Sequence, residues 1–243
     1  MTTSSRRRLQ LRCRSDLTFS SPEQPGNLKP SYMIVLFDFD GVIADTESQY
    51  TVFWNKKGKE YLGLDNFGLT IKGQTFKQIA AGYFKDNLKE LYEEIEPELN
   101  EFEVNMSYDY VPGAMEFMKE LKEAGIRTAI VTSSHNIKMA NAYRAHPELL
   151  ELVDTILTSN DFSRSKPDPE CFLKGMEVLG GRPEETVIFE DSLHGIAAGR
   201  AAGAKVIGLT TTNKSEVLTP LCDLVIDDFT QLKISDIISE DRI

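Results

Sequence analysis

The sequence predicts an α/β protein in which an α-helical cap domain is inserted into a doubly wound, Rossmann-like parallel sheet. Three observations predict this fold class. Short apolar runs rich in β-branched and aromatic residues recur along the chain, segments of helical periodicity separate them, and one long stretch after the first run is helical throughout. Right-handed crossovers in such a sheet bring the carboxyl ends of all strands to one edge, where ligands bind.

Six apolar runs predict six strands. The first, residues 32–38, reads YMIVLFD and suits a strand that is buried on both faces of the sheet. The other five runs cover residues 126–132, 153–159, 186–191, 204–210 and 223–227.

Two of the intervening helices carry clear boundary signals. Residues 112–125 place apolar side chains on one helical face and end at Gly125, which can adopt the left-handed conformation that stops a helix. Residues 168–180 begin with Asp168 as the expected N-cap and end at Gly180. In this second helix we expect four side chains to face the sheet: Phe172, Leu173, Met176 and Leu179.

The chain divides into three predicted regions. Residues 1–31 hold six basic residues against two acidic ones and lack periodicity, so we expect a disordered lead-in. This lead-in either is a transit peptide or precedes a true start at Met33. Residues 32–47 and 112–243 form the predicted catalytic core, and residues 48–111 form the predicted helical cap.

Composition excludes several classes of protein. The net charge of −11 argues against nucleic-acid binding, which requires a basic surface, and no apolar run is long enough to span a membrane. The three cysteines form no CxxC pair, so neither a disulfide framework nor a thiolate zinc site is indicated. We expect a cytoplasmic monomer that binds a small molecule, or an organellar protein if the lead-in is a transit peptide.

The strongest chemical signal lies in residues 35–49, VLFDFDGVIADTESQ. Asp38 and Asp40 follow the first predicted strand, and two such close carboxylates repel one another unless a cation or a shared proton relieves them. Gly41 allows a tight turn directly after them. Thr46 is interpreted as the first residue of a helical capping box, TESQ.

Three further strand ends carry groups that suit phosphate chemistry. Thr132 and Ser133 follow the second strand and can donate hydrogen bonds to a phosphoryl oxygen, although serine and threonine also serve as N-caps. Lys166 precedes a proline-fixed turn and can neutralise a phosphate, or can be an exposed loop lysine. Glu190 and Asp191 end the fourth strand and, with the acids of the first strand, can ligate Mg²⁺. Four strand ends with compatible chemistry favour one site.

In this order, the stretches DFDGVIADT, SKPDPECF and EDSLHGIAAGRAAGA resemble the haloacid dehalogenase superfamily, and more narrowly its β-phosphoglucomutase-like branch. The resemblance implies that Asp38 is a nucleophile that forms an aspartyl-phosphate and that Asp40 is the general acid and base. It also implies that the transferring phosphoryl is held by Thr132, Ser133 and Lys166. The Mg²⁺ ligands implied by the resemblance are Asp38, Asp40, Glu190 and Asp191.

The resemblance leaves the reaction open between several classes. The leading hypothesis is a Mg²⁺-dependent phosphatase that acts on a small phosphate monoester such as a sugar phosphate; the alternative is a sugar phosphomutase. A pyrophosphatase and an inactive binding protein are further alternatives. A mutase needs a second phosphate site in its cap, but this chain has Tyr50 and Phe76 where β-phosphoglucomutase has histidine and arginine. The cap residues expected to determine specificity are Tyr50, Lys72, Gly73 and Gln74.

Overall fold

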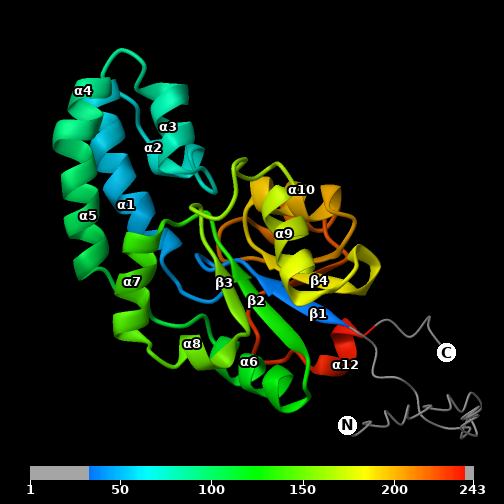
Figure 1. Cartoon of the computed structure of the whole chain (residues 1–243). Helices are drawn as coiled ribbons and strands as arrows, with labels where there is room; N and C mark the ends of the chain where they lie inside the picture. The colour runs from blue at the N-terminus through cyan, green and yellow to red at the C-terminus, as the bar shows by residue number, and fades with distance from the viewer. Residues whose placement is uncertain (1–32, 239–243) are drawn as a thin grey trace, which may run out of the picture. The chain divides into compact units, whose positions relative to one another are not determined.

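The computed structural model describes residues 33–238 of the chain (Figure 1). The predicted lead-in, residues 1–31, lies outside this range, so its assignment stays a prediction. None of the helices in the described part of the chain is both long enough and apolar enough to cross a membrane.

One six-stranded parallel sheet forms the centre of the molecule, which confirms the predicted fold class. Its strands lie in the order β3-β2-β1-β4-β5-β6, and β1 pairs with β2 on one side and with β4 on the other. The order of connection reverses beside β1, which is where ligands bind in sheets of this kind. The strand bounds, each within a predicted run, are β1 (Ile34–Phe37), β2 (Arg127–Val131), β3 (Thr155–Leu157), β4 (Thr186–Glu190), β5 (Lys205–Leu209) and β6 (Leu224–Ile226).

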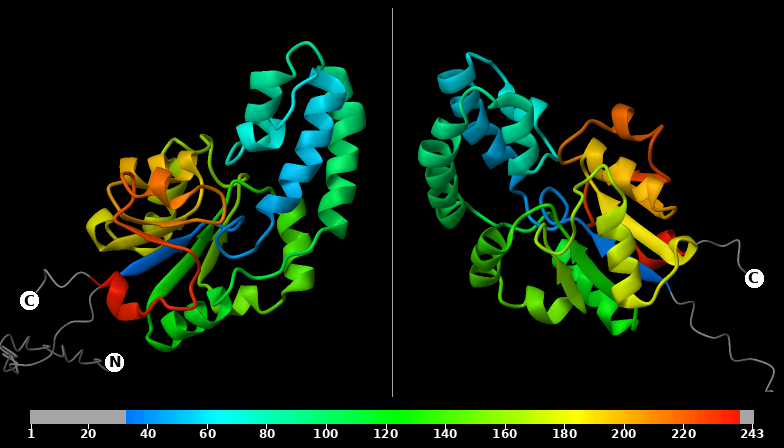
Figure 2. Two further views of the ribbon diagram at one scale, coloured as in Figure 1. Left: turned by 180° about the vertical axis from the view of Figure 1, so that it is seen from behind. Right: turned by 45° about the horizontal axis from the view of Figure 1, so that its top comes forward.

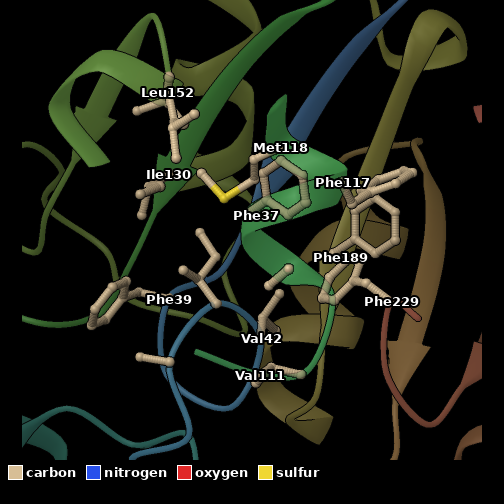
Figure 3. Packing of buried hydrophobic residues seen from close by; sticks show 14 of the residues in the cluster. Phe37, Phe39, Val42, Val111, Phe117, Met118, Ile130, Leu152, Phe189 and Phe229 are labelled. Atoms are coloured by element: carbon tan, nitrogen blue, oxygen red, sulfur yellow. The ribbon is translucent and has the colours of Figure 1, made fainter. Parts of the chain in front are cut away.

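Strand β1 is buried on both faces, because its side chains alternate between two hydrophobic clusters. Val35 and Phe37 belong to the cluster on one face, while Ile34 and Leu36 belong to the cluster on the other. The first cluster is rich in aromatic rings: Phe37 stacks on Phe189 of β4 with ring centroids 5.1 Å apart (Figure 3). A core packed this tightly fixes the carboxyl ends of β1 and β4 relative to one another.

Helices cover both faces of the sheet (Figures 1 and 2). The aromatic face packs against α6 (Ala114–Glu123), α7 (Asn136–Ala145), α8 (Leu149–Leu152) and α12 (Ile234–Ile237). The opposite face packs against α9 (Glu170–Leu179) and α10 (Leu193–Ala201). Two short elements complete the sheet domain. Helix α11 (Ser215–Leu218) follows β5, and a 3-10 turn at Pro183–Glu185 precedes β4.

The predicted boundaries of α9 need two small corrections. The helix begins at Glu170, with Pro169 rather than Asp168 at the N-cap position, although Asp168 Oδ1 still accepts a hydrogen bond from Glu170 N. Leu173 is 44% exposed, so the expectation that it faces the sheet is wrong. It lies one position beyond Phe172, and the apolar stripe of the helix is too narrow to include both.

The segment between β1 and α6 is a helical insert with a hydrophobic core of its own. Trp54, Phe67, Phe84 and Ile95 are among the buried residues of that core, which is separate from the two clusters on the sheet. The insert comprises α1 (Glu47–Lys57), a π-helical turn (Gly58–Leu62), α2 (Phe67–Thr70), α3 (Phe76–Tyr83), α4 (Leu88–Glu90), a second π-helical turn (Leu91–Ile95) and α5 (Glu96–Asn105).

Candidate active site

Asp38 extends the hydrogen bonding of β1 by one residue before the chain turns. Its backbone N–H donates to the carbonyl of Phe189 at 3.0 Å, and Gly41 N–H then closes the turn by donating to the Ala44 carbonyl at 2.8 Å. Gly41 has a φ of +74°. A Cβ at this position would lie 2.1 Å from Asp191 Oδ2, so the turn requires glycine for both its conformation and its close approach to that carboxylate.

Lys166 joins two of the predicted site carboxylates. Its ammonium donates to Asp38 Oδ1 at 2.8 Å, to Glu190 Oε1 at 2.6 Å and to the Val131 carbonyl at 3.2 Å. The side chain is 2% exposed. Burial by itself lowers the pKa of Lys166, but the carboxylates of Asp38 and Glu190 outweigh burial and raise it above its ordinary value. The lysine therefore stays charged and partly compensates the buried acids.

Asp38, Glu190 and Asp191 form a cluster that can hold a metal ion. One carboxylate oxygen from each lies within 4.8 Å of the others, and all three residues are buried. Burial, together with the charges of Glu190 and Glu47, raises the pKa of Asp191 well above its ordinary value. This negative charge exceeds what Lys166 alone can balance. An all-oxygen donor set with surplus charge fits a hard divalent cation such as Mg²⁺.

Asp40 accepts hydrogen bonds from three side chains. Thr46 Oγ1 and the ammonium of Lys138 donate to its Oδ1, and Ser134 Oγ donates to its Oδ2 at 2.7 Å. Burial alone would raise the pKa of Asp40, but the Lys138 charge and these hydrogen bonds bring it below its ordinary value. The carboxylate is therefore held ionised in the absence of substrate.

The capping-box interpretation of Thr46 is wrong. Thr46 occupies the N-cap position of α1, but its side chain makes no capping hydrogen bond and donates to Asp40 instead. The side chain is fully buried. A hydroxyl that faces a buried carboxylate satisfies that group, and this outweighs what a capping bond to a helix N–H would contribute.

Thr132 and Ser133 follow β2, as predicted, and lie at the same edge. Thr132 is fully buried, and its Oγ1 accepts a hydrogen bond from Ser134 N at 3.0 Å. Ser133 Oγ is buried without a hydrogen-bond partner among residues 33–238. A buried hydroxyl of this kind costs free energy unless it is satisfied, so Ser133 is available to a ligand oxygen.

The four predicted cap residues line the cavity at the site, and each makes a different contact. Lys72 forms a half-buried ion pair with Glu47, with 3.7 Å between Nζ and Oε2. Gly73 passes so close to Ser192 that an added Cβ would lie 2.8 Å from its hydroxyl. The Gln74 amide donates to the carbonyl of Thr70, the last residue of α2, and the Tyr50 hydroxyl donates to Glu103.

A cavity of about 410 Å³ joins the sheet edge to the insert. Its volume is within the range that suits a small organic ligand. Ten of the eleven predicted site residues line it: Asp38, Asp40, Tyr50, Lys72, Gly73, Gln74, Thr132, Ser133, Lys166 and Asp191. The eleventh, Glu190, lies directly behind the lining and contacts Lys166.

Sequence reasoning missed three residues that act on these carboxylates. Lys138 binds Asp40, and Thr212 Oγ1 donates to Asp191 Oδ2. Glu47 reaches close enough to the cluster for its charge to raise the pKa of Asp191. Thr212 follows β5, so the strand-end argument applied to that strand would have found it. No comparable signal marks Lys138, because a lysine in the first turn of a helix is ordinary.

We expect Gly195→Ala to destabilise the protein and weaken metal binding. A Cβ at Gly195 in α10 would lie 1.7 Å from Glu190 Oε1, the oxygen that binds Lys166. Glu190 is fully buried and its other oxygen accepts bonds from Asp191 N and Ser192 N, so it cannot move freely. Thermal unfolding should show a decrease of about 1–3 kcal/mol in the free energy of unfolding. Calorimetric titration should show weaker Mg²⁺ binding.

Gly82→Ala provides the matched control for this substitution. Gly82 lies in α3, is exposed, and would place its Cβ in open space. Alanine is favoured over glycine within a helix, so this variant should be at least as stable as the natural protein. If the two variants unfold alike, close packing of Gly195 against Glu190 is not what constrains that position.

Comparison with known proteins places this geometry in a family context. The family described as haloacid dehalogenase-like hydrolase matches residues 35–209, which include every site residue that the sequence predicted. The matched segment begins in β1 and ends in β5, so it covers the site together with the insert.

Two curated relatives are phosphatases by name. The chain is 27% identical over 208 residues to validoxylamine A 7'-phosphate phosphatase from Streptomyces hygroscopicus subsp. limoneus, covering 83% of this chain and 96% of the relative. It is 30% identical over 216 residues to glycerol-1-phosphate phosphohydrolase 2 from Saccharomyces cerevisiae, and this match covers 82% of this chain and 83% of the relative.

Solved structures share the fold. A haloacid dehalogenase-type hydrolase of family IA, variant 3, from Entamoeba histolytica superposes with a TM-score of 0.73 at 24% identity, covering 84% of this chain and 96% of that one. A β-phosphoglucomutase from Clostridium difficile superposes with a TM-score of 0.67 at 25% identity, and the match covers 84% of this chain and 95% of that one.

Proposed function

Because the chain belongs to the haloacid dehalogenase-like hydrolases, in their β-phosphoglucomutase-like branch with a helical insert, we propose that it is a Mg²⁺-dependent phosphatase of small organic phosphate monoesters. Sugar and polyol phosphates are the proposed substrate class. One observation carries the proposal: Asp38 lies at a cavity edge with one oxygen held by Lys166, beside the buried carboxylates of Glu190 and Asp191. This arrangement combines a nucleophile, a fixed cation and a metal site.

The first step of the proposed reaction transfers the phosphoryl group to Asp38. A carboxylate oxygen of Asp38 attacks phosphorus and the bond from phosphorus to the leaving oxygen breaks, which yields an aspartyl-phosphate. Lys166, Thr132 and Ser133 bind the phosphoryl oxygens. In the second step, water attacks phosphorus and the bond to Asp38 breaks, which releases inorganic phosphate. Positioning and charge stabilisation supply most of the rate, because phosphoryl transfer requires little other chemistry from a protein.

Asp40 is the proposed general acid and base. In the first step it gives a proton to the leaving oxygen, and in the second it takes a proton from the attacking water. The carboxylate is held ionised by Lys138, Thr46 and Ser134 when the site holds no substrate. An arriving phosphoryl group brings negative charge close to Asp40 and thereby favours its protonated form, as the first step requires.

Mg²⁺ bound by Asp38, Glu190 and Asp191, with the backbone carbonyl of Asp40, would supply positive charge opposite the phosphoryl oxygens. The cluster supports this assignment through its burial and its surplus of negative charge. Lys166 forms ion pairs with both Asp38 and Glu190 and so holds these two carboxylates close together.

A sugar phosphomutase is the alternative, and the likeness to the β-phosphoglucomutase from Clostridium difficile favours it. The cap positions weigh against it. The Tyr50 hydroxyl donates a hydrogen bond to Glu103, and the Phe76 ring packs against Trp54 and Tyr92. Neither side chain therefore offers a positive charge to a second phosphate. Conversion of β-glucose 1-phosphate to glucose 6-phosphate, dependent on a bisphosphate primer, would establish the mutase instead.

A panel of phosphate monoesters tests the proposed function. The purified protein, incubated with Mg²⁺ and each ester in turn, should release inorganic phosphate from sugar and polyol phosphates. Chelation of the metal should abolish that release and added Mg²⁺ should restore it, because the buried carboxylates are repulsive without a cation. Absence of phosphate release from every ester in the presence of Mg²⁺ would reject the proposal.

A further inference from the structure

Glu103 is a buried acid in the cavity that the proposed reaction does not use. It lies in the last turns of α5, at the end of the insert, and is 4% exposed. Its Oε1 accepts a hydrogen bond from the Tyr50 hydroxyl at 2.8 Å. Its Oε2 is buried and has no hydrogen-bond partner in the described part of the chain. Because an unsatisfied buried carboxylate oxygen is costly, this atom is expected to receive a ligand proton.

His135 also lines the cavity and lies beside this oxygen. It is the N-cap residue of α7, and its Nδ1 accepts a hydrogen bond from the backbone N–H of Lys138 at 3.1 Å. That bond assigns the proton of the neutral ring to Nε2. Nε2 lies 3.9 Å from Glu103 Oε2, which is too far for a direct hydrogen bond. A donor and an acceptor therefore face one another across a short gap.

A hydroxyl group is complementary to this gap. Its oxygen, placed beside the line between the two atoms and about 2.8 Å from each, accepts from His135 and donates to Glu103. A phosphate cannot replace it, because the negative charge of Glu103 repels an anion.

The gap lies close to the leaving-group side of the reaction centre. Lys138 links the two places, since its backbone N–H fixes His135 while its ammonium binds Asp40. Tyr50, which binds Glu103, also packs its ring 4.4 Å from the same ammonium. Asp40 is the group proposed to protonate the leaving oxygen. A hydroxyl near it therefore belongs to the leaving group rather than to the transferred phosphoryl.

We propose that Glu103 and His135 form a hydroxyl-binding subsite that selects polyol and sugar phosphates over alkyl phosphates. This inference rests on the proposed phosphatase function, because it assigns the leaving group of that reaction. A site built around a hydroxyl discriminates strongly against the analogue that lacks it, because its polar groups are then left unpaired.

Matched substrate pairs test the subsite. Glycerol 1-phosphate is compared with n-propyl phosphate, and sorbitol 6-phosphate with n-hexyl phosphate, in the natural protein and in Glu103→Gln. The glutamine can keep the bond from Tyr50 through its carbonyl oxygen but presents an amide N–H to the gap. We expect kcat/KM for the polyol phosphates to fall about 10- to 100-fold, the effect of an unpaired polar group in a binding site, and kcat/KM for the alkyl phosphates to stay within about twofold.

Two further variants make this result specific. His135→Asn removes the Nε2 donor but can still accept the capping hydrogen bond from Lys138 N, so it should lower kcat/KM for the polyol phosphates selectively in the same way. Glu101→Gln changes an exposed acid in the same helix and should leave both classes unchanged. Equal losses for both classes in Glu103→Gln, or a polyol preference that survives the substitution, would overturn the subsite.

A binding measurement separates failure of the subsite from failure of the proposed function. Asp38→Asn is titrated calorimetrically with each polyol phosphate and its alkyl partner, alone and combined with Glu103→Gln. A polyol preference that is present in the single variant and lost in the double variant upholds the subsite even if the natural protein hydrolyses nothing. Equal affinity for both members of each pair in the single variant rejects the subsite, whatever the turnover results.

Discussion

Asp38→Asn is expected to lower kcat by at least about 10⁴-fold, because the amide cannot act as the nucleophile that the proposed mechanism requires. Asparagine has nearly the same shape and its carbonyl oxygen can still accept the hydrogen bond that Lys166 now gives to Oδ1. The variant should therefore fold and bind substrate. Steady-state phosphate release measures the loss, and mass spectrometry after rapid quenching should detect a phosphorylated peptide containing residue 38 only in the natural protein.

Asp45→Asn is the matched control for this prediction. Asp45 lies in the same turn sequence as Asp38 and Asp40, but it is exposed and does not line the cavity. The control variant should retain turnover within about twofold, as expected for a surface substitution. Turnover in Asp38→Asn that approaches that of the control would contradict an aspartyl-phosphate at this position.

The fold was predictable because its signals are local. Each strand of this parallel sheet is a continuous apolar run, and β1 shows why: all four of its side chains are buried, on alternating faces. The strand ends were predictable for the same reason, since topology alone brings the carboxyl ends of parallel strands together. Asp38, Thr132 and Asp191 could thus be assigned to one edge before any distance was known.

The contacts around Asp40 were not predictable, because they depend on side-chain directions and on distant segments. Thr46 fits a capping motif equally well by sequence, and only its burial beside Asp40 decides between the two. Lys138 is separated from Asp40 by nearly a hundred residues and carries no motif. Glu103 was not predictable either, because it occurs in an acidic stretch of the insert that resembles an exposed helix face. Its side chain is nevertheless buried and lines the cavity.

Lys166→Met is expected to cause the largest loss of stability. The substitution removes the ammonium that compensates Asp38 and Glu190 and leaves two buried carboxylates close together. Removing one partner from a buried ion pair costs about 3–5 kcal/mol. Urea denaturation at pH 8, with metal chelated, should show a decrease of this size in the free energy of unfolding. The control variant Lys119→Met, at an exposed position of α6, should change that free energy little.

The stability lost in Lys166→Met should also depend on pH, with a sign that follows from the pKa of Asp38. Burial, against the pull of Lys166, raises the pKa of Asp38 from its ordinary value of 3.8 to about 7 in the folded protein. The folded state therefore binds the proton more tightly than the unfolded state, so stability decreases as pH rises from about 4 through 7. Without Lys166 this decrease should extend to higher pH, because the charge that opposes burial is gone and the pKa of Asp38 rises further. The deficit of Lys166→Met should shrink at pH 5, where Asp38 is protonated, and adding Glu190→Gln should recover part of it at pH 8. A deficit of equal size at both pH values, unaffected by Glu190→Gln, would mean that Lys166 stabilises the protein through packing and not through charge.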